Sequence, residues 1–315
     1  MNLFNKQKMT QRQSLSLDAK IQMTKQRVKA WIEHWDGDVY LAFSGGWDST
    51  VLRHIILSMG YKIPFVFSNT GLEMPEIVAF VRSLDGVVEI KPKKNFKDVW
   101  KNDGIPVGSK KVAKMIRVLQ EGDNGKNSNM HRLYDTGISK DGREGKAWKI
   151  PNKWRKFVDS NIKVTDKCCD ALKKEPLDTY AKETGLKRID GMMAAEGGFR
   201  SNLHKCNDFG KKPASHPMLF WTDADTAEYT NKFNVEQCIV YFDRDGEYKG
   251  KAVTIPGETR TGCMFCGFGA HLEKGLNRFQ KMSVTHPRQH AIVMDRMGMR
   301  KAMEMINVKV DYEGG

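Results

Sequence analysis

The sequence lacks the features that mark membrane, secreted and fibrous proteins. No apolar run approaches the roughly 18 residues that a membrane-spanning helix needs, and the first twenty residues have no apolar stretch of the kind found in secretory signals. Glycine and proline, 28 and 10 residues, are near ordinary usage, and no repeat or low-complexity tract is present. We therefore expect a cytoplasmic protein without a membrane partner. Its 315 residues, 40% of them hydrophobic, suffice for one large core or for a core and a small satellite.

Acidic residues are the scarcer charged class. The 38 Asp and Glu residues stand against 52 Lys and Arg residues, which leaves a net charge of +14. Such a surplus fits a polyanionic partner such as DNA or tRNA, because each neutralised phosphate releases a counterion. A solvated lysine-rich surface, or a basic pocket for a charged nucleotide, accounts for the same surplus. Nucleic acid is therefore one expected partner. The charge alone does not distinguish it from the other two explanations.

Short apolar runs that end in polar loops alternate with segments of helical spacing. The runs Val39–Phe43, Ile63–Phe67 and Val87–Ile90 are predicted strands, and unusual loops follow at Ser44 and Asn69. Repeated strand–loop–helix units predict an α/β fold with a parallel sheet, flanked by helices and joined by right-handed crossovers. In such sheets ligands bind beyond the carboxyl ends of the strands, where both loops lie.

The domain organisation is predicted in three contiguous ranges. We expect a basic arm and helix in residues 1–36, the α/β domain in 37–250, and a small C-terminal segment with a Cys-x-x-Cys and helices in 251–315. Residues 122–150, rich in Gly, Asn, Ser, Asp and Lys, are expected to form a long inserted loop.

Further elements are predicted from periodicity and turn residues. A hairpin is expected with its turn at Asp243–Gly246, between Ile239–Tyr241 and Lys251–Ile255. The predicted helices are Leu17–Trp35, Val51–Met59, one that begins near Pro75, Lys167–Thr184, Asp223–Phe233 and most of His286–Ile306.

The loop after the first predicted strand has the composition of a phosphate-binding turn. It reads Ser44-Gly45-Gly46-Trp47-Asp48-Ser49-Thr50. The two glycines let backbone N–H groups approach phosphate oxygens at a helix N-terminus, which carries partial positive charge. Ser44, Ser49 and Thr50 can donate hydroxyl hydrogen bonds. Asp48 can hold a divalent cation that bridges the phosphates.

The alternative role of this loop is purely structural. It is not a Walker loop, because no Gly-Lys-Ser/Thr is present. A glycine turn whose Asp and Ser only cap a helix has the same composition. The position between a strand and a helix favours phosphate binding.

Four of the six cysteines stand in two pairs: Cys168 with Cys169, and Cys263 with Cys266. In a cytosolic chain such pairs indicate metal binding or redox chemistry before structural disulfides. Adjacent side chains diverge, which suits a cubane iron–sulfur cluster because each thiolate reaches a separate iron corner. Tetrahedral zinc, a redox disulfide and inert thiols are the alternatives. Cys206 and Cys238 are expected to be buried apolar residues, with a persulfide on Cys206 as a lesser alternative.

Taken in order, these motifs resemble the phosphoadenosine phosphosulfate (PAPS) reductase family. Ser44–Ser49 resembles the PP-loop of the N-type ATP pyrophosphatases, and Asn69–Glu76 is similar to the family segment beside the adenosine. Gly191–Arg200 and Pro217–Thr222 also resemble family segments, so the resemblance spans roughly residues 38–285. It implies an adenine nucleotide alpha-hydrolase-like, Rossmann-like fold.

The resemblance implies roles for individual residues. The implied nucleotide-binding residues are Ser44, Gly45, Gly46, Asp48, Ser49, Thr50, Asn69, Thr70 and Gly71. The implied catalytic residues are Asp48, Ser49 and Arg200, whose guanidinium suits phosphate or sulfate. A solvated surface position is the alternative for Arg200. The spacing Cys168-Cys169 and Cys263-x-x-Cys266 resembles the [4Fe–4S] motif of assimilatory APS reductases, so these four residues are the implied metal ligands, with zinc as the competitor.

Two departures from the family pattern bear on the reaction. The reductases have a degenerate PP-loop, because their substrate lacks a β,γ-pyrophosphate, whereas this chain keeps Ser-Gly-Gly-x-Asp-Ser. They also carry a catalytic cysteine in a Glu-Cys-Gly-type tail, and here no cysteine follows Cys266. Trp47 is unusual in the loop and either packs against the following helix or closes over the triphosphate.

These departures favour ATP as the substrate. We expect an ATP pyrophosphatase and sulfurtransferase that uses ATP and Mg²⁺ to activate DNA or tRNA, as in DNA phosphorothioation or tRNA thiolation. A cysteine desulfurase or another sulfur donor would be its partner. Reduction of APS or PAPS to sulfite, and a non-catalytic nucleotide-sensing module, are the alternatives.

Overall fold

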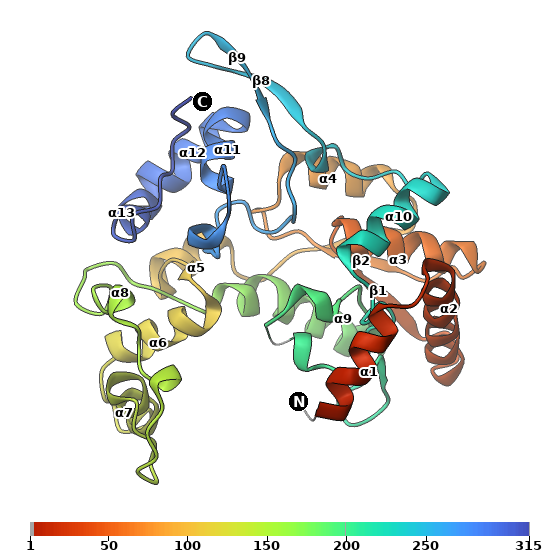
Figure 1. Ribbon diagram of the computed structural model, residues 1–315, viewed down its shortest axis with the longest axis horizontal. Coiled ribbons are helices and arrows are strands. Elements are labelled where there is room, and N and C mark those ends of the chain that lie inside the picture. The colour runs from red at the N-terminus through yellow and green to blue at the C-terminus, as the bar shows by residue number, and fades with distance from the viewer. Residues whose placement is uncertain (1–2, 199, 315) are drawn as a thin grey trace. The chain divides into compact units, whose positions relative to one another are not determined.

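The chain folds into two compact units, each assembled from segments that are not contiguous in the sequence. A computed structural model describes residues 3–198 and 200–314 (Figure 1). The first unit contains the residues up to Asn69, Glu73–Pro92 and Lys173–Tyr241, and the second contains Thr70–Leu72, Lys93–Leu172 and the residues from Phe242 onward. The three contiguous domain ranges stay a prediction.

A six-stranded sheet forms the centre of the first unit, in the order β3-β2-β1-β5-β7-β6. Its strands are β1 (Val39–Phe43), β2 (Phe65–Ser68), β3 (Val87–Ile90), β5 (Lys187–Ile189), β6 (Asn207–Asp208) and β7 (Ala214–Ser215). All neighbouring strands pair in parallel except β6 with β7. The predicted α/β fold with a largely parallel sheet is confirmed.

β1 lies in the middle of this sheet because its side chains are apolar on both faces. Leu41 is paired with Phe65 on one side and Ile189 on the other. Tyr40 and Leu41, which point to opposite faces of the strand, are both buried. A strand of this kind needs cover on both faces. The first two strands of the predicted set therefore occupy the core of the unit, and β1 carries the loop at Ser44 on its carboxyl end.

Helices cover both faces of the sheet. The helices of the first unit are α1 (Leu3–Gln13), α2 (Leu17–His34), α3 (Trp47–Ser58), α4 (Pro75–Ser83), α9 (Glu175–Thr184) and α10 (Asp223–Phe233). α2, α3 and α10 contact one another, as Figure 1 also shows, and α9 contacts β2. Right-handed crossovers put α3 and α4 on one face and α9, which leads to β5, on the other. The strand order reverses between β1 and β5, which makes this the switch point where ligands bind in such sheets.

A buried ion pair joins α2 to α10. The Lys20 Nζ atom lies 2.7 Å and 2.6 Å from the two carboxylate oxygens of Asp225, and the Lys20 side chain is 2% exposed. Asp225 also completes the capping box that begins α10, with Thr222 as the N-cap. Desolvating both charges is costly, so the pair stabilises the fold only while both partners are present.

The second unit is mostly helical. Its helices are α5 (Phe96–Asp103), α6 (Lys110–Gln120), α7 (Ser128–Thr136), α8 (Asn152–Arg155), α11 (Arg278–Thr285), α12 (Pro287–Ala291) and α13 (Met299–Glu304). Its strands are β4 (Val107–Gly108), β8 (Arg244–Tyr248), β9 (Lys251–Ile255) and β10 (Gly267–Phe268). β4 and β10 pair in parallel, and β8 and β9 form a hairpin. In the described part of the chain, no helix combines the length and the apolar character that a membrane crossing requires.

Two predicted segments were wrong in detail. The hairpin turns at Lys249 and Gly250, not at Asp243–Gly246, and Ile239–Tyr241 is a 3₁₀ turn. Both turn residues have positive φ, as the tight hairpin turn requires. The expected long loop contains α7, which ends at Gly137 in the left-handed conformation and packs against α6. The weak periodicity of that segment concealed a helix held by tertiary packing.

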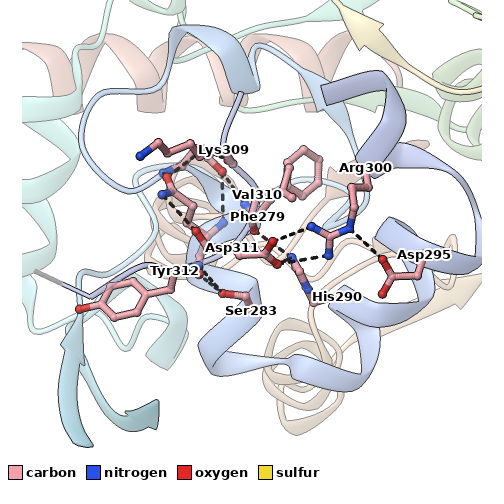
Figure 2. A network of polar contacts seen from close by, with 11 residues as sticks. Phe279, Ser283, His290, Asp295, Arg300, Lys309, Val310, Asp311 and Tyr312 are labelled. Carbon is pink, nitrogen blue, oxygen red and sulfur yellow. Dashed lines mark hydrogen bonds and ion pairs between the residues drawn. The ribbon is translucent and has the colours of Figure 1, made fainter. Parts of the chain in front are cut away.

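The C-terminal segment is fixed to α11, α12 and α13 by a polar network (Figure 2). Arg300 donates to both carboxylate oxygens of Asp311 and also to Asp295. The buried His290 has its Nε2 atom 2.8 Å from the carbonyl oxygen of Val310. Arg300 lowers the pKa of Asp311 by its hydrogen bonds. Residues 309–312 are thereby anchored to the helical end of the second unit.

We predict that removing the charge of Lys20 destabilises the first unit. Lys20→Met should lower the free energy of unfolding by about 3 kcal/mol or more, because Asp225 would stay buried without its cation. Lys29→Met is the matched control, since Lys29 makes an ion pair with Glu33 in which both side chains are 60% exposed, and should cost less than about 1 kcal/mol. Urea unfolding of both variants measures the difference, and equal costs would contradict the assignment.

Candidate functional site

The loop between β1 and α3 is closed by its own hydroxyl groups. The Ser44 and Ser49 hydroxyl oxygens are 3.0 Å apart, and the backbone N–H of Gly46 donates to the Ser44 hydroxyl at 3.2 Å. The Ser49 and Thr50 hydroxyls both donate to the carbonyl oxygen of Gly46, at 2.9 Å and 3.0 Å. Ser49 and Thr50 are buried, whereas Ser44 is exposed. The inner hydroxyls therefore shape the turn, and Ser44 stays accessible to a ligand.

Gly45 is the position where this turn cannot accept a side chain. Its φ is +68°, and a Cβ there would lie 2.5 Å from Cγ2 of Val81 and 3.1 Å from Cγ2 of Ile77, both on α4. Positive φ and close backbone approach are the two conditions that favour glycine. The backbone turn is therefore pressed against α4 before α3 begins at Trp47.

Trp47 is held by two neighbours outside its own helix. Its backbone N–H donates to the Tyr241 hydroxyl at 2.9 Å, and its indole N–H donates to the carbonyl oxygen of Thr226 at 3.3 Å. The Trp47 and Tyr241 rings meet edge to face, 5.2 Å between centroids. The Trp47 ring thus packs toward α10 and the 3₁₀ turn at Ile239–Tyr241, and not only against the following helix.

Tyr241 is a site residue that sequence reasoning missed. Tyr241 was predicted to lie in a strand of the hairpin and to have no chemical role. In the structure its hydroxyl accepts from the first backbone N–H of α3, a position where helix N-termini bind anions. No local signal identifies this contact, because 194 residues separate Tyr241 from Trp47.

The second side of the site comes from the segment after β5. Gly191 lies beside the first turn of α3, and a Cβ on it would be 3.4 Å from the backbone carbonyl of Asp48. Asp190, just before it, has one oxygen 2.6 Å from the His216 Nδ1 atom and the other 3.4 Å from Nε of Arg188. The segments after β1 and β5 therefore meet at the switch point of the sheet.

Asp48, Ser49 and Arg200 all lie in the first unit. Asp48 and Ser49 occupy the first turn of α3, next to the Gly191 backbone. Arg200 begins a 3₁₀ turn after β5 and makes an ion pair with Glu196. Its role toward a phosphate or sulfate stays a prediction.

The segment after β2 crosses from the first unit into the second. The Asn69 side-chain amide donates to Glu89 of β3 at 2.9 Å. In the second unit the Thr70 hydroxyl accepts the backbone N–H of Leu72 and lies 3.9 Å from the Cys263 sulfur. Gly71 has a φ of +75°. The predicted nucleotide-binding set is thus divided between the two units.

All four paired cysteines lie in the second unit, whereas Cys206 and Cys238 are buried in the first. None of the six forms a disulfide. Burial raises the pKa of Cys168, and its neighbours Cys169, Cys266 and Cys263 raise it further. Burial also raises the pKa of Cys266 to about 12, with Cys263 and Cys169 adding to the effect. Each effect on another thiol requires proximity, so the two cysteine pairs lie within electrostatic range of each other.

Two ion pairs fix the Cys168-Cys169 end of this group on α6. Asp166 accepts from Nε of Arg117 at 2.7 Å, and Asp170 accepts from Nζ of Lys110 at 3.0 Å. The predicted helix from Lys167 is helical from Cys168 onward and contains a π-helical turn over Asp170–Lys174 before α9 begins. π turns inside helices occur often at functional sites.

Backbone contacts fix the Cys263–Cys266 end. The Met264 N–H donates to the Leu72 carbonyl oxygen at 2.7 Å, and Arg278 donates to the Cys266 carbonyl oxygen at 3.1 Å. A Cβ on Gly267 would lie 2.4 Å from the carbonyl oxygen of Pro106, so only glycine lets β10 approach β4 this closely. The turn that carries both thiols is therefore held on three sides.

The chemistry of these four residues fits a thiolate-bound centre. Buried thiols with raised pKa values stay neutral unless a cation stabilises the thiolate, and metal binding supplies that cation and releases the protons. Among the described residues, no three His, Cys, Asp or Glu side chains are grouped at the spacing of a single metal ion.

Comparison with known proteins finds a similarity that covers part of the chain. Residues 38–122 match the family described as "Phosphoadenosine phosphosulfate reductase domain". A crystal structure of phosphoadenylyl-sulfate (PAPS) reductase from Candida auris, in a phosphate complex, is similar at 15% identity and a TM-score of 0.40, over 71% of this chain and 90% of that chain. No curated protein matches the chain. The structural similarity is too distant to transfer the role of any residue.

We predict that the loop cannot tolerate even one methyl group at Gly45. Gly45→Ala should lower the free energy of unfolding by about 2–4 kcal/mol, the sum of the cost of left-handed backbone and of overpacking against Val81. Gly60→Ala is the matched control, because Gly60 has a φ of +81° but no atom within 4 Å of the added Cβ; it should cost only the backbone part, about 1–2 kcal/mol. Denaturant unfolding compares the two, and an equal loss would show that Val81 yields freely.

Proposed function

We propose that the chain, whose residues 38–122 match the phosphoadenosine phosphosulfate reductase domain, is an ATP pyrophosphatase that activates an oxygen of a nucleic acid for replacement by sulfur. The loop Ser44–Ser49 carries the proposal, because it combines a glycine turn without room for side chains, an exposed hydroxyl and the N-terminus of α3. It lies at the carboxyl end of β1, beside the reversal of strand order. These are the requirements for gripping a polyphosphate.

The proposed reaction has two steps. The acceptor oxygen attacks the α-phosphorus of ATP, the bond from that phosphorus to the α,β-bridging oxygen breaks, and pyrophosphate leaves. Sulfur from the donor then displaces the adenylated oxygen, which leaves as part of AMP. Ser44 and the first-turn amides of α3 would hold the leaving pyrophosphate, and Asp48 would hold Mg²⁺, which neutralises the charge that develops on it.

Tyr241 extends this proposal to a residue outside the loop. Its hydroxyl contacts the first N–H of α3, so a phosphate bound there would meet or displace it. Arg200, from the segment after β5, is the proposed second cation for the phosphates. Both roles concern the first unit alone.

We propose that Cys168, Cys169, Cys263 and Cys266 hold a [4Fe–4S] cluster. Cys169, Cys263 and Cys266 lie close enough to Cys168 to raise its pKa, and Cys263 and Cys169 act likewise on Cys266, which supports this ligand set. The adjacent pair suits a centre with separate iron corners. When bound, the cluster would supply a site that holds or relays sulfur. Zinc on the same thiolates is the competing centre.

The family description itself favours one other function, the reduction of APS or PAPS. In that reaction sulfite is released, and an external thiol would supply the electrons. The intact Ser-Gly-Gly-x-Asp-Ser sequence favours ATP over these substrates, because it offers ligands for a β,γ-pyrophosphate. A nucleotide-sensing module without catalysis would bind ATP and show neither reaction.

Exchange of labelled pyrophosphate into ATP tests the nucleotide chemistry. We expect Mg²⁺-dependent exchange in the presence of duplex DNA or total tRNA, and expect Asp48→Asn to lower it by about 100-fold or more, as for other groups that stabilise transition-state charge. Glu33→Gln is the control, since Glu33 is exposed on α2, and should leave the rate unchanged. Sulfite release from APS or PAPS without exchange would replace this proposal with the reductase. Nucleotide binding without either reaction would support the sensing module.

Metal analysis after anaerobic purification tests the cluster. We expect about four iron and four sulfide per chain with a visible absorption band, and loss of the band in Cys263→Ser. Cys238→Ala should keep the band, because Cys238 is a buried residue of the first unit. One zinc per chain without iron would refute the cluster.

A further inference from the structure

The positive charge of the chain is concentrated in one segment of the second unit. Residues 93–172 contain 19 Lys and Arg against 10 Asp and Glu, so a quarter of the chain carries nine of the 14 surplus charges. Fourteen of the 15 lysines in this segment are exposed. An ordinary solvated surface interleaves both signs, so this uneven distribution indicates a surface built for an anion.

Five of these lysines lie on neighbouring elements. Lys111 and Lys114 are one helical turn apart on α6 and share a face. The other three, Lys146, Lys149 and Lys153, follow in and after the 3₁₀ turn Lys146–Trp148 and in α8. We call these five residues the basic strip.

Contacts within the second unit bring the strip together. The Lys111 Nζ atom donates to the carbonyl oxygen of Ala147 at 2.9 Å, which places the 3₁₀ turn on the exposed side of α6. α6 and α8 also contact each other, and Figure 1 shows α6, α7 and α8 as neighbours. On the opposite side of α6, Ala113, Ile116 and Leu119 are buried. The lysines therefore face outward from a packed base.

The charges of the strip are not neutralised by the carboxylates of the segment. Within the described residues, none of the five lysines has a carboxylate oxygen within 4 Å. Five of the ten acidic side chains pair instead with arginines and with Lys110: Asp135 with Arg155, Asp141 with Arg143, Glu121 and Asp166 with Arg117, and Asp170 with Lys110. These acidic side chains therefore form ion pairs within the unit, and the lysines of the basic strip remain available to an anionic partner.

None of the aromatic side chains of the segment is exposed, and Phe96 and Trp148 are half-buried. Trp154 is 2% exposed and Phe157 is fully buried, and Trp148 lies against the backbone of Gly145. Proteins that grip single strands stack bases on exposed aromatic rings, and RNA readers use the same stacking on unpaired bases. No large apolar side chain between residues 93 and 172 is exposed, so insertion into a lipid surface has no anchor.

From these observations we propose that the basic strip binds the phosphate backbone of duplex DNA. An outward row of lysines without stacking rings contacts phosphates in a manner independent of sequence. This inference extends the proposed function by naming the class of acceptor. Binding requires neither ATP nor sulfur, so it can fail while the ATP chemistry stands, and the reverse also holds.

Fluorescence anisotropy with a labelled duplex of about 25 base pairs, in the absence of ATP, tests the proposal. The test variant of the full-length chain is Lys114→Glu, Lys146→Glu and Lys149→Glu combined; Lys111 is kept because it holds the 3₁₀ turn. The control variant is Lys29→Glu, Lys62→Glu and Lys182→Glu combined, three exposed lysines of the first unit with the same change in net charge. Circular dichroism and thermal melting establish that both variants fold.

We expect the test variant to lose at least about tenfold in affinity and the slope of log K against log salt to fall by about 3, since each phosphate contact contributes about 0.9. The control variant should lose less than threefold. Equal losses in the two variants, or no binding of duplex DNA by the unaltered chain, would overturn the proposal. Tighter binding of tRNA or of single-stranded DNA than of the duplex would also overturn it and would assign the strip to that partner.

Discussion

The close approach of a backbone turn to α4 is the constraint on which the first unit depends. A Cβ at Gly45 would lie within 2.5 Å of Val81, so the turn between β1 and α3 exists in this form only because residue 45 has no side chain. The turn fixes where α3 begins and leaves its N-terminus directed at the switch point of the sheet. Polyphosphate binding, as proposed, uses a geometry that core packing already requires.

The candidate metal ligands of the second unit are cysteine thiols, and burial disfavours their ionisation. Desolvation keeps the Cys168 and Cys266 thiols neutral, and the ion pairs of Asp166 and Asp170 hold the adjacent segment on α6. A cation that binds there has to compensate the desolvation of several thiolates at once. The lysines of the basic strip belong to the same unit and face solvent. The cysteine thiols and the exposed positive charge therefore lie in one unit.

The sequence predicted elements wherever a single local signal was strong. β1 and β3 have the predicted bounds, and the predicted α10 begins at Asp223 as expected, behind a Thr222 capping box. The predictions from the sequence were wrong where tertiary contacts override weak local preferences. α7 is stabilised by packing on α6, and the hairpin turn lies at Lys249 and Gly250, where a lysine adopts positive φ without a local signature.

The candidate site likewise has some features that the sequence predicts and others that only the tertiary structure decides. Glycine spacing, the serine and aspartate of the loop and the pairing of cysteines are local patterns, because backbone freedom and side-chain chemistry are properties of single residues. These patterns supplied the family resemblance and the candidate residues. Only the tertiary structure decided that Tyr241 reaches Trp47, that Gly191 lies beside Asp48, and that four thiols far apart in the sequence become neighbours. Those contacts depend on chain segments brought together by burial of the sheet and helices, which no local pattern records.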